Sequence, residues 1–304
     1  MERTRTHRAA VQAAAGRMSA QDCLIETRHG RFAVRDYGGE GPPLLLVHGT
    51  GHNLEVWTPL AAILRDRFHI LAFDMRGHGR TEVDSTDAER YWRDIGDIIA
   101  SVGVATPVLV GHSTGAYAVA AHAAAGGACA GLALLDGFVL DARPSAEAAK
   151  SKAFDRRSPW KAWRLGWSAR EEEMHRWITS QAVRAARDGL PPDVMATMMR
   201  RAFRAGEGVY LRRPTLDDLE AVCGNDPADT IYPERGLYSR IRHPMLFLLA
   251  SRGPYAKRRF EIESLAEQGA GRCFAVIDAG HNLHLERPAE VGRIIAQTFG
   301  KPFG

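Results

Sequence analysis

The stretch TPVLVGHSTGAY, residues 106–117, places one serine between two glycines where two kinds of secondary structure meet. The apolar run 108–110 is typical of a buried strand, and the alanine-rich stretch 116–125 is typical of a helix. A turn this sharp strains the backbone at Ser113 and leaves no room for side chains at Gly111 and Gly115. In this context G-x-S-x-G indicates a nucleophile elbow, which lifts a serine hydroxyl to the edge of a sheet.

The rest of the chain alternates short apolar runs with stretches of helical spacing. Strands are expected at 44–47, 68–73, 107–110, 132–135, 245–249 and 273–277, and helices at 54–65, 87–102, 260–268, 289–299 and from about 114. A hairpin is expected over 23–37. This alternation predicts an α/β fold with a mostly parallel central sheet flanked by helices.

Residues 141–240 interrupt the alternation and predict a helical cap (lid) inserted into a core domain made of 21–140 and 241–304. Residues 1–20 are expected to form a flexible leader. Between 152 and 213 there are 14 Lys/Arg against 7 Asp/Glu, a difference of +7. This excess indicates either a solvated helical surface or attraction of an anionic substrate, and the sequence leaves both open.

Composition and the remaining motifs narrow the function classes. The net charge of +4 without a long basic run argues against nucleic-acid binding. Neither a secretory signal nor an apolar run of about 20 residues is found, so we expect a cytoplasmic protein without a membrane partner. Four cysteines without a C-x-x-C pair, and no H-E-x-x-H or G-x-G-x-x-G motif, predict neither metal nor cofactor. The oligomeric state cannot be read from the sequence.

Four motifs in order resemble those of the α/β-hydrolase fold superfamily. Besides GHSTG they are HGTG at 48–51, FDMRGHGRT at 73–81 and AGHNLHLERP at 279–288. The likeness covers about 23–140 and 241–300, and Thr81 stands where the family has a serine. It implies a serine hydrolase or esterase with a helical cap. It also assigns the general base to His281, with His284 as the competitor, and an oxyanion hole to the backbone N–H groups of Thr50 and Thr114.

The acid of the triad departs from the common pattern of similar hydrolases. Most of them carry an aspartate after the strand that corresponds to 245–249, but residues 251–259 contain no carboxylate. Some relatives use the loop after the strand that follows the nucleophile helix, and there the chain has Asp136. We therefore predict a catalytic triad of Ser113, His281 and Asp136. A purely structural Asp136 is the alternative, with Asp141, Asp226 and Asp229 as further candidates for the acid.

These residues predict hydrolysis of a carboxylic ester, lactone or thioester of a bulky apolar small molecule through an acyl-serine. Five aromatic residues could line its pocket or form the cap's own core: Trp160, Trp163, Trp167, Tyr210 and Tyr255. One alternative is an epoxide hydrolase with Asp136 as nucleophile and Tyr210, Tyr238 or Tyr255 as acid. Another is a binding scaffold without catalytic activity.

Overall fold

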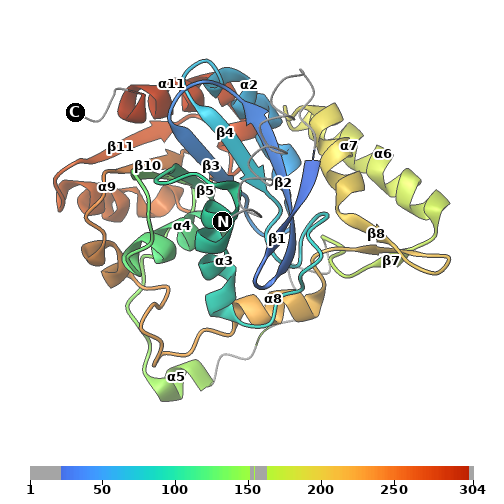
Figure 1. The fold of residues 1–304 in the computed structure, drawn as a ribbon, viewed down its shortest axis with the longest axis horizontal. Coiled ribbons are helices and arrows are strands. Elements are labelled where there is room, and N and C mark those ends of the chain that lie inside the picture. The colour runs from blue at the N-terminus through green and yellow to red at the C-terminus, as the bar shows by residue number, and fades with distance from the viewer. Residues whose placement is uncertain (1–21, 151–153, 155–162, 301–304) are drawn as a thin grey trace, which may run out of the picture.

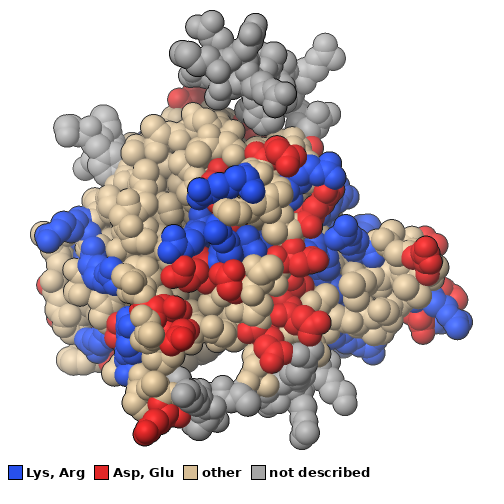
Figure 2. Space-filling view, turned by 60° about the horizontal axis from the view of Figure 1, so that its bottom comes forward, with Lys and Arg blue, Asp and Glu red and all other residues tan. Residues whose placement is uncertain are grey.

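The computed structural model describes residues 22–150, 154 and 163–300. The expected leader, residues 1–20, and Trp160 of the expected pocket lie outside these residues. No helix in the described part of the chain is long and apolar enough to cross a membrane. Lysine and arginine mingle with aspartate and glutamate on the face shown in Figure 2, as the small net charge leads one to expect.

An eight-stranded sheet forms the centre of the molecule (Figure 1). Its order is β1-β2-β4-β3-β5-β6-β10-β11, with β1 and β2 antiparallel and the six other strands parallel. The strands are β1 (Asp22–Thr27), β2 (Gly30–Gly38), β3 (Pro43–Val47), β4 (His69–Phe73), β5 (Val108–His112), β6 (Gly131–Leu135), β10 (Met245–Ala250) and β11 (Arg272–Ile277). The prediction of a mostly parallel sheet is confirmed.

Helices cover both faces of this sheet. On one face lie α3 (Ala88–Val102), α4 (Thr114–Ala124) and α9 (Arg259–Glu267), and on the other α2 (Thr58–Leu64) and α11 (Pro288–Phe299). Alternate residues of β3 pack into the two layers, with Leu45 in the first core and Leu44 and Leu46 in the second. All three are fully buried, which explains why the parallel strands are continuous apolar runs in the sequence.

The shorter elements lie at the edges of this core. They are η1 (Leu54–Trp57), η2 (Arg235–Arg240), η3 (Ala256–Arg258) and α10 (Leu283–Glu286).

Local interactions determine where α3, the longest helix on the first face, begins and ends. Asp87 caps its start by accepting a hydrogen bond from the Arg90 N–H at 2.8 Å, and Gly103 ends it with a left-handed φ of 74°.

The segment between β6 and β10, where the sequence predicts an inserted cap, contains α5 (Ala146–Lys150), α6 (Glu171–Arg187), α7 (Pro192–Arg201) and α8 (Leu216–Cys223). It also contains a three-stranded sheet of β7 (Ser168–Ala169), β9 (Tyr210–Arg212) and β8 (Phe203–Ala205), which the helical expectation did not include. In Figure 1, α6 and α7 stand beside the central sheet. Strands of two or three residues are too short to leave an alternating pattern in the sequence.

A buried ion network fastens α7 to the core. The Arg201 guanidinium donates to Asp74 Oδ2 at 2.8 Å and also bonds Asp22. Asp74 is fully buried, and its carboxylate accepts the backbone N–H groups of Leu54 at 2.9 Å and Arg80 at 2.7 Å. Burial raises the pKa of Asp74, while the Arg201 charge opposes that rise. The network therefore ties the insertion to the loop that follows β4.

The order of the strands indicates at which edge of the sheet a ligand-binding site is expected. The chain runs from β3 to β4 on one side and returns to β5 on the other side of β3. The carboxyl ends of β3 and β5 are thus the switch point of the sheet, where open α/β sheets bind ligands. The two loops that begin there carry HGTG and Ser113.

Candidate active site

Ser113 lies in a strained turn between β5 and α4. Its φ is 55° and its ψ is −122°, a conformation that L-residues rarely adopt. Its N–H donates to the carbonyl of Leu135 at 3.0 Å. A side-chain carbon at Gly115 would collide with the backbone carbonyl of Val47, and one at Gly137 would collide with the Ser113 backbone. The first close approach explains Gly115 of the G-x-S-x-G motif, and the second explains Gly137, which lies outside the motif.

Asp136 and His281 meet at this same edge of the sheet. His281 Nδ1 lies 2.7 Å from Asp136 Oδ2, while Asp136 Oδ1 accepts the Ala250 N–H at 3.1 Å. Asp136 is fully buried and has a positive φ of 42°. With both carboxylate oxygens engaged, the His281 Nδ1 carries the proton, which leaves the lone pair on Nε2.

The loop after β10, where most similar hydrolases carry the acid, packs closely against Asp136. A side-chain carbon at Gly253, in the loop after β10, would collide with the Asp136 carboxylate. The loop therefore approaches Asp136 so closely that only glycine fits at this point.

The His281 loop is held against the elbow by a neighbouring histidine. His112 Nε2 donates to the His281 carbonyl at 2.9 Å, and the two ring centroids are 4.7 Å apart. Among the described residues, no hydrogen bond joins the Ser113 hydroxyl to the His281 ring. Catalytic contacts of this kind often tighten only when substrate binds.

The two predicted oxyanion donors are neighbours in space. The Thr50 N–H donates to the Thr114 hydroxyl at 2.8 Å, and Tyr91 OH lies 3.0 Å from that same hydroxyl. Thr114 begins α4, so its own N–H has no acceptor within the helix. Tyr91 was missed from the sequence, because nothing in the pattern of α3 distinguishes it from a core tyrosine. Its burial raises the phenol pKa to about 12.

His48 and His78 shape the loop that carries Thr50. The His48 ring donates to the Gly49 carbonyl through Nδ1 and accepts the Met75 N–H at Nε2, 3.0 Å away. The His78 ring likewise accepts the Gly51 N–H at 3.1 Å. Burial lowers the pKa of His78 to about 4 and that of His48 well below its usual value. Both rings are therefore neutral structural supports.

The competing candidates take no part in the contact between Asp136 and His281. His284 is fully buried, and no hydrogen bond of the described residues reaches either of its ring nitrogens. The Asp141 side chain is 83% exposed and pairs with Arg258. Asp226 and Asp229 bond each other within a surface turn. The structure thus brings Asp136, and none of these carboxylates, to His281.

Among the described residues, the predicted pocket aromatics do not form one cluster. Trp167 packs against Trp177 and Phe203, with ring centroids 5.9 and 6.0 Å apart, and Tyr210 borders the same cap cluster. This placement matches the alternative interpretation of a small cap core. Two further predicted aromatics lie outside that cluster: Tyr255 packs edge-on against Phe138, and Trp163 is 48% exposed.

Comparison with known proteins connects this geometry to a family. A family model described as "Alpha/beta hydrolase family" matches residues 44–294. The chain is 40% identical over 117 residues to protein phosphatase methylesterase 1 of Mus musculus, covering 35% of this chain and 30% of that protein. It is 41% identical over 80 residues to 2-(acetamidomethylene)succinate hydrolase of Mesorhizobium japonicum, covering 26% and 29%. The chain therefore spans about a third of the length of the curated relatives it matches.

Solved structures support the same fold over most of the chain. The thioesterase domain from the curacin biosynthetic pathway superposes with a TM-score of 0.72 at 18% identity, covering 91% of this chain and 99% of that one. E-2-(acetamidomethylene)succinate hydrolase superposes with a TM-score of 0.71 at 20% identity, covering 93% and 100%. At these identities the likeness concerns the fold.

Proposed function

Since this chain belongs to the alpha/beta hydrolase family, we propose that it cleaves carboxylic esters, lactones or thioesters with Ser113 as nucleophile. The observation that carries the proposal is the 2.7 Å contact between His281 and the buried Asp136, beside a serine in a strained elbow. The names of two similar proteins, a methylesterase and a thioesterase domain, support the substrate class.

The proposed reaction begins with attack of the Ser113 hydroxyl oxygen on the substrate carbonyl carbon. His281 Nε2 takes the hydroxyl proton, and the Asp136 carboxylate stabilises the imidazolium that forms. His281 then returns the proton to the leaving alcohol or thiol as the acyl-serine forms. A water molecule, activated by the same histidine, releases the acid and restores the serine.

The negative charge on the tetrahedral intermediate needs donors in place. The N–H groups of Thr50 and Thr114 are the proposed donors, each worth about 3–4 kcal/mol of barrier lowering in comparable sites. In the structure the Thr50 N–H already donates to the Thr114 hydroxyl. A substrate oxygen must therefore replace that hydroxyl, which Tyr91 can hold aside through its own hydrogen bond.

The substrate is proposed to be a small molecule with a bulky apolar part. Trp163 supports this because it presents a large apolar surface from the cap, outside the cluster around Trp167. An epoxide hydrolase using Asp136 as nucleophile is less well supported. A nucleophilic carboxylate needs an accessible oxygen, whereas Asp136 is fully buried with both oxygens accepting hydrogen bonds.

A fluorophosphonate probe tests the proposal directly, because it reacts only with activated serines. We expect labelling of the wild-type chain at Ser113, confirmed by peptide mapping, and hydrolysis of p-nitrophenyl esters of graded acyl length. Ser113→Ala should lose both. Ser145→Ala, in the exposed stretch before α5, is the matched control and should retain both. Ester hydrolysis that survives Ser113→Ala would refute the proposed nucleophile.

A further inference from the structure

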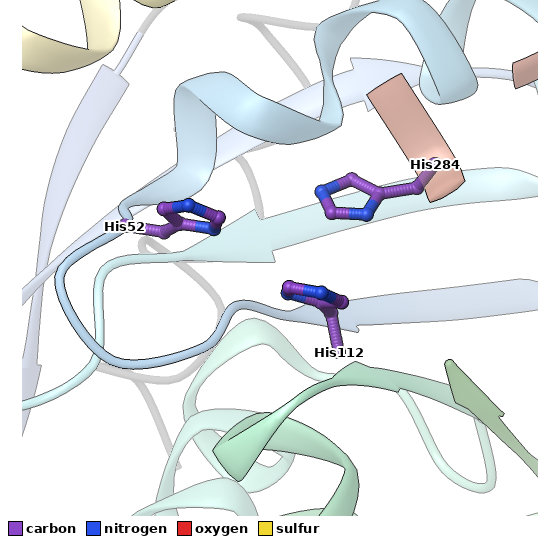
Figure 3. Close-up of side chains that lie close together, drawn as sticks. All are labelled: His52, His112 and His284. Carbon is purple, nitrogen blue, oxygen red and sulfur yellow. The ribbon is translucent and has the colours of Figure 1, made fainter. Parts of the chain in front are cut away.

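Three histidines that the proposed reaction does not use converge beside the active site. His52 lies in the loop after β3, His112 is the last residue of β5, and His284 belongs to α10 (Figure 3). One ring nitrogen from each lies within 4.8 Å of the corresponding nitrogens of the other two. Segments far apart in the sequence therefore bring three imidazoles around one space.

Four ring nitrogens in this cluster have no hydrogen-bond partner among the described residues. His112 uses Nε2–H to donate to the His281 carbonyl, so its Nδ1 carries a lone pair. That Nδ1 is buried without a hydrogen bond, as are both nitrogens of His284 and Nδ1 of His52. Buried polar atoms in native proteins are rarely left unpaired, so these nitrogens point to a ligand, and each ring can offer it one lone pair.

A neutral imidazole binds a metal ion through the ring nitrogen that carries its lone pair. Three nitrogen ligands without a carboxylate suit zinc and similar ions, whereas magnesium and calcium prefer oxygen ligands.

We propose that His52, His112 and His284 bind one divalent zinc-class ion. In such sites a liganding histidine commonly donates its other N–H to a backbone carbonyl, which fixes the ring. His112 already makes that contact with the carbonyl of His281. Three protein ligands leave the fourth tetrahedral position for water.

Binding requires a modest rearrangement. Zn–N bonds of about 2.0–2.1 Å place tetrahedral ligand nitrogens roughly 3.4 Å apart, closer than the 4.8 Å limit observed. The rings of His52 and His112 are nearly parallel, at 11° with centroids 5.5 Å apart, so one must rotate to aim at a shared ion. His52 is the ring that can do so, because it sits in a loop and keeps some exposure, whereas His112 is fixed at the end of a central strand.

The proposed site is distinct from the catalytic pair but adjoins it. His52 lies two residues after Thr50 in the same loop, and His112 precedes Ser113 in the elbow. His284 lies three residues after His281. An ion held by the three rings would link these segments through a single centre. This inference concerns ion binding and stands whether or not Ser113 is the nucleophile.

Metal binding to the untagged, EDTA-treated chain tests the inference. Zinc is titrated by calorimetry, and cobalt by the visible absorption that a tetrahedral site gives. We expect one ion per chain and a rise in melting temperature with zinc. His284→Gln and His52→Gln should each weaken zinc binding by more than about 100-fold, since even an outer-shell change costs about 10–100-fold.

Two controls make the result decisive. His122→Gln removes another buried histidine with an unpartnered Nε2, in α4, and should bind zinc like the wild type. His281→Asn should also keep the site. Unchanged affinity in both His284→Gln and His52→Gln, or loss in His281→Asn alone, would overturn the proposal and place any ion at the catalytic pair. Circular dichroism of each metal-free variant shows whether it is folded, and the second ligand variant decides if the first is not.

Discussion

Replacing Asp136 by asparagine isolates what the carboxylate does for His281. The new side chain has nearly the same shape but only one oxygen. The Ala250 N–H, which now donates to Asp136 Oδ1 at 3.1 Å, needs that oxygen, so the amide nitrogen must take the place of Oδ2. There it lies 2.7 Å from His281 Nδ1 and donates a hydrogen bond to it. The imidazole then carries its proton on Nε2 and cannot accept the Ser113 proton.

The expected loss follows from the wrong tautomer. In a serine-histidine-aspartate site this change lowers turnover by about 10⁴-fold, equivalent to roughly 5.5 kcal/mol of barrier. The stability of the fold should change little by comparison, because the volume and the Ala250 contact are retained. The assay is kcat for p-nitrophenyl ester hydrolysis, together with the rate of fluorophosphonate labelling at Ser113.

Asp278→Asn is the matched control for this variant. Asp278 lies three residues before His281, but its side chain is 77% exposed and pairs with Arg252. Its amide variant should keep most of the wild-type rate. A folded Asp136→Asn chain that retains more than about a tenth of wild-type turnover would refute the assignment of Asp136 as the orienting acid, and an equally slow Asp278→Asn would point to a non-specific effect.

Three further changes have defined outcomes. Arg201→Met leaves a buried carboxylate uncompensated and should lower the free energy of unfolding by about 3–5 kcal/mol in urea titrations, whereas Arg200→Met, on the more exposed side of α7, should change it little. Because the pKa of His78 falls from 6.5 to about 4 on folding, the unfolded chain binds the extra proton between these values. His78 should therefore lower the free energy of unfolding by about 3 kcal/mol as the pH drops from 6.5 to 4. In urea titrations across that range, His78→Gln should lose less stability than the wild type. Gly137→Ala should prevent folding or abolish probe labelling, since the added carbon meets the elbow, while Gly206→Ala has space and should be tolerated; a fully labelled Gly137→Ala chain would contradict the close approach.

The elements that sequence reasoning located are those with strong local patterns. The buried strands are continuous apolar runs, and the G-x-S-x-G spacing identifies the turn at Ser113 because only glycine fits its flanks. Asp136 could be proposed because some similar hydrolases carry the acid after this strand, at the edge where the carboxyl ends of the parallel strands meet. Its contact with His281 is then a consequence of β6 and β11 both flanking β10.

The contacts that were missed depend on residues distant in the sequence. Arg201 and Asp74 are 127 positions apart, and neither has a neighbour that signals an ion pair. Tyr91 lies near the start of α3, and its hydroxyl contacts Thr114 at the start of α4. The three clustered histidines come from a loop, the end of a strand and a short helix, with no ligand-like spacing. Side-chain contacts of this kind arise from tertiary packing, which the hydrophobic periodicity of the sequence does not predict.

The glycine at position 253 limits how the acid could relocate. A carbon there would strike the Asp136 carboxylate, so the loop after β10 and the tip of β6 compete for one volume. A chain with an aspartate in that loop would need to lose Asp136 or move its carboxylate away. The acid can therefore occupy one of the two loops but not both. Moving it to the loop after β10 requires replacements in both loops, and a replacement in only one of them should give an inactive chain.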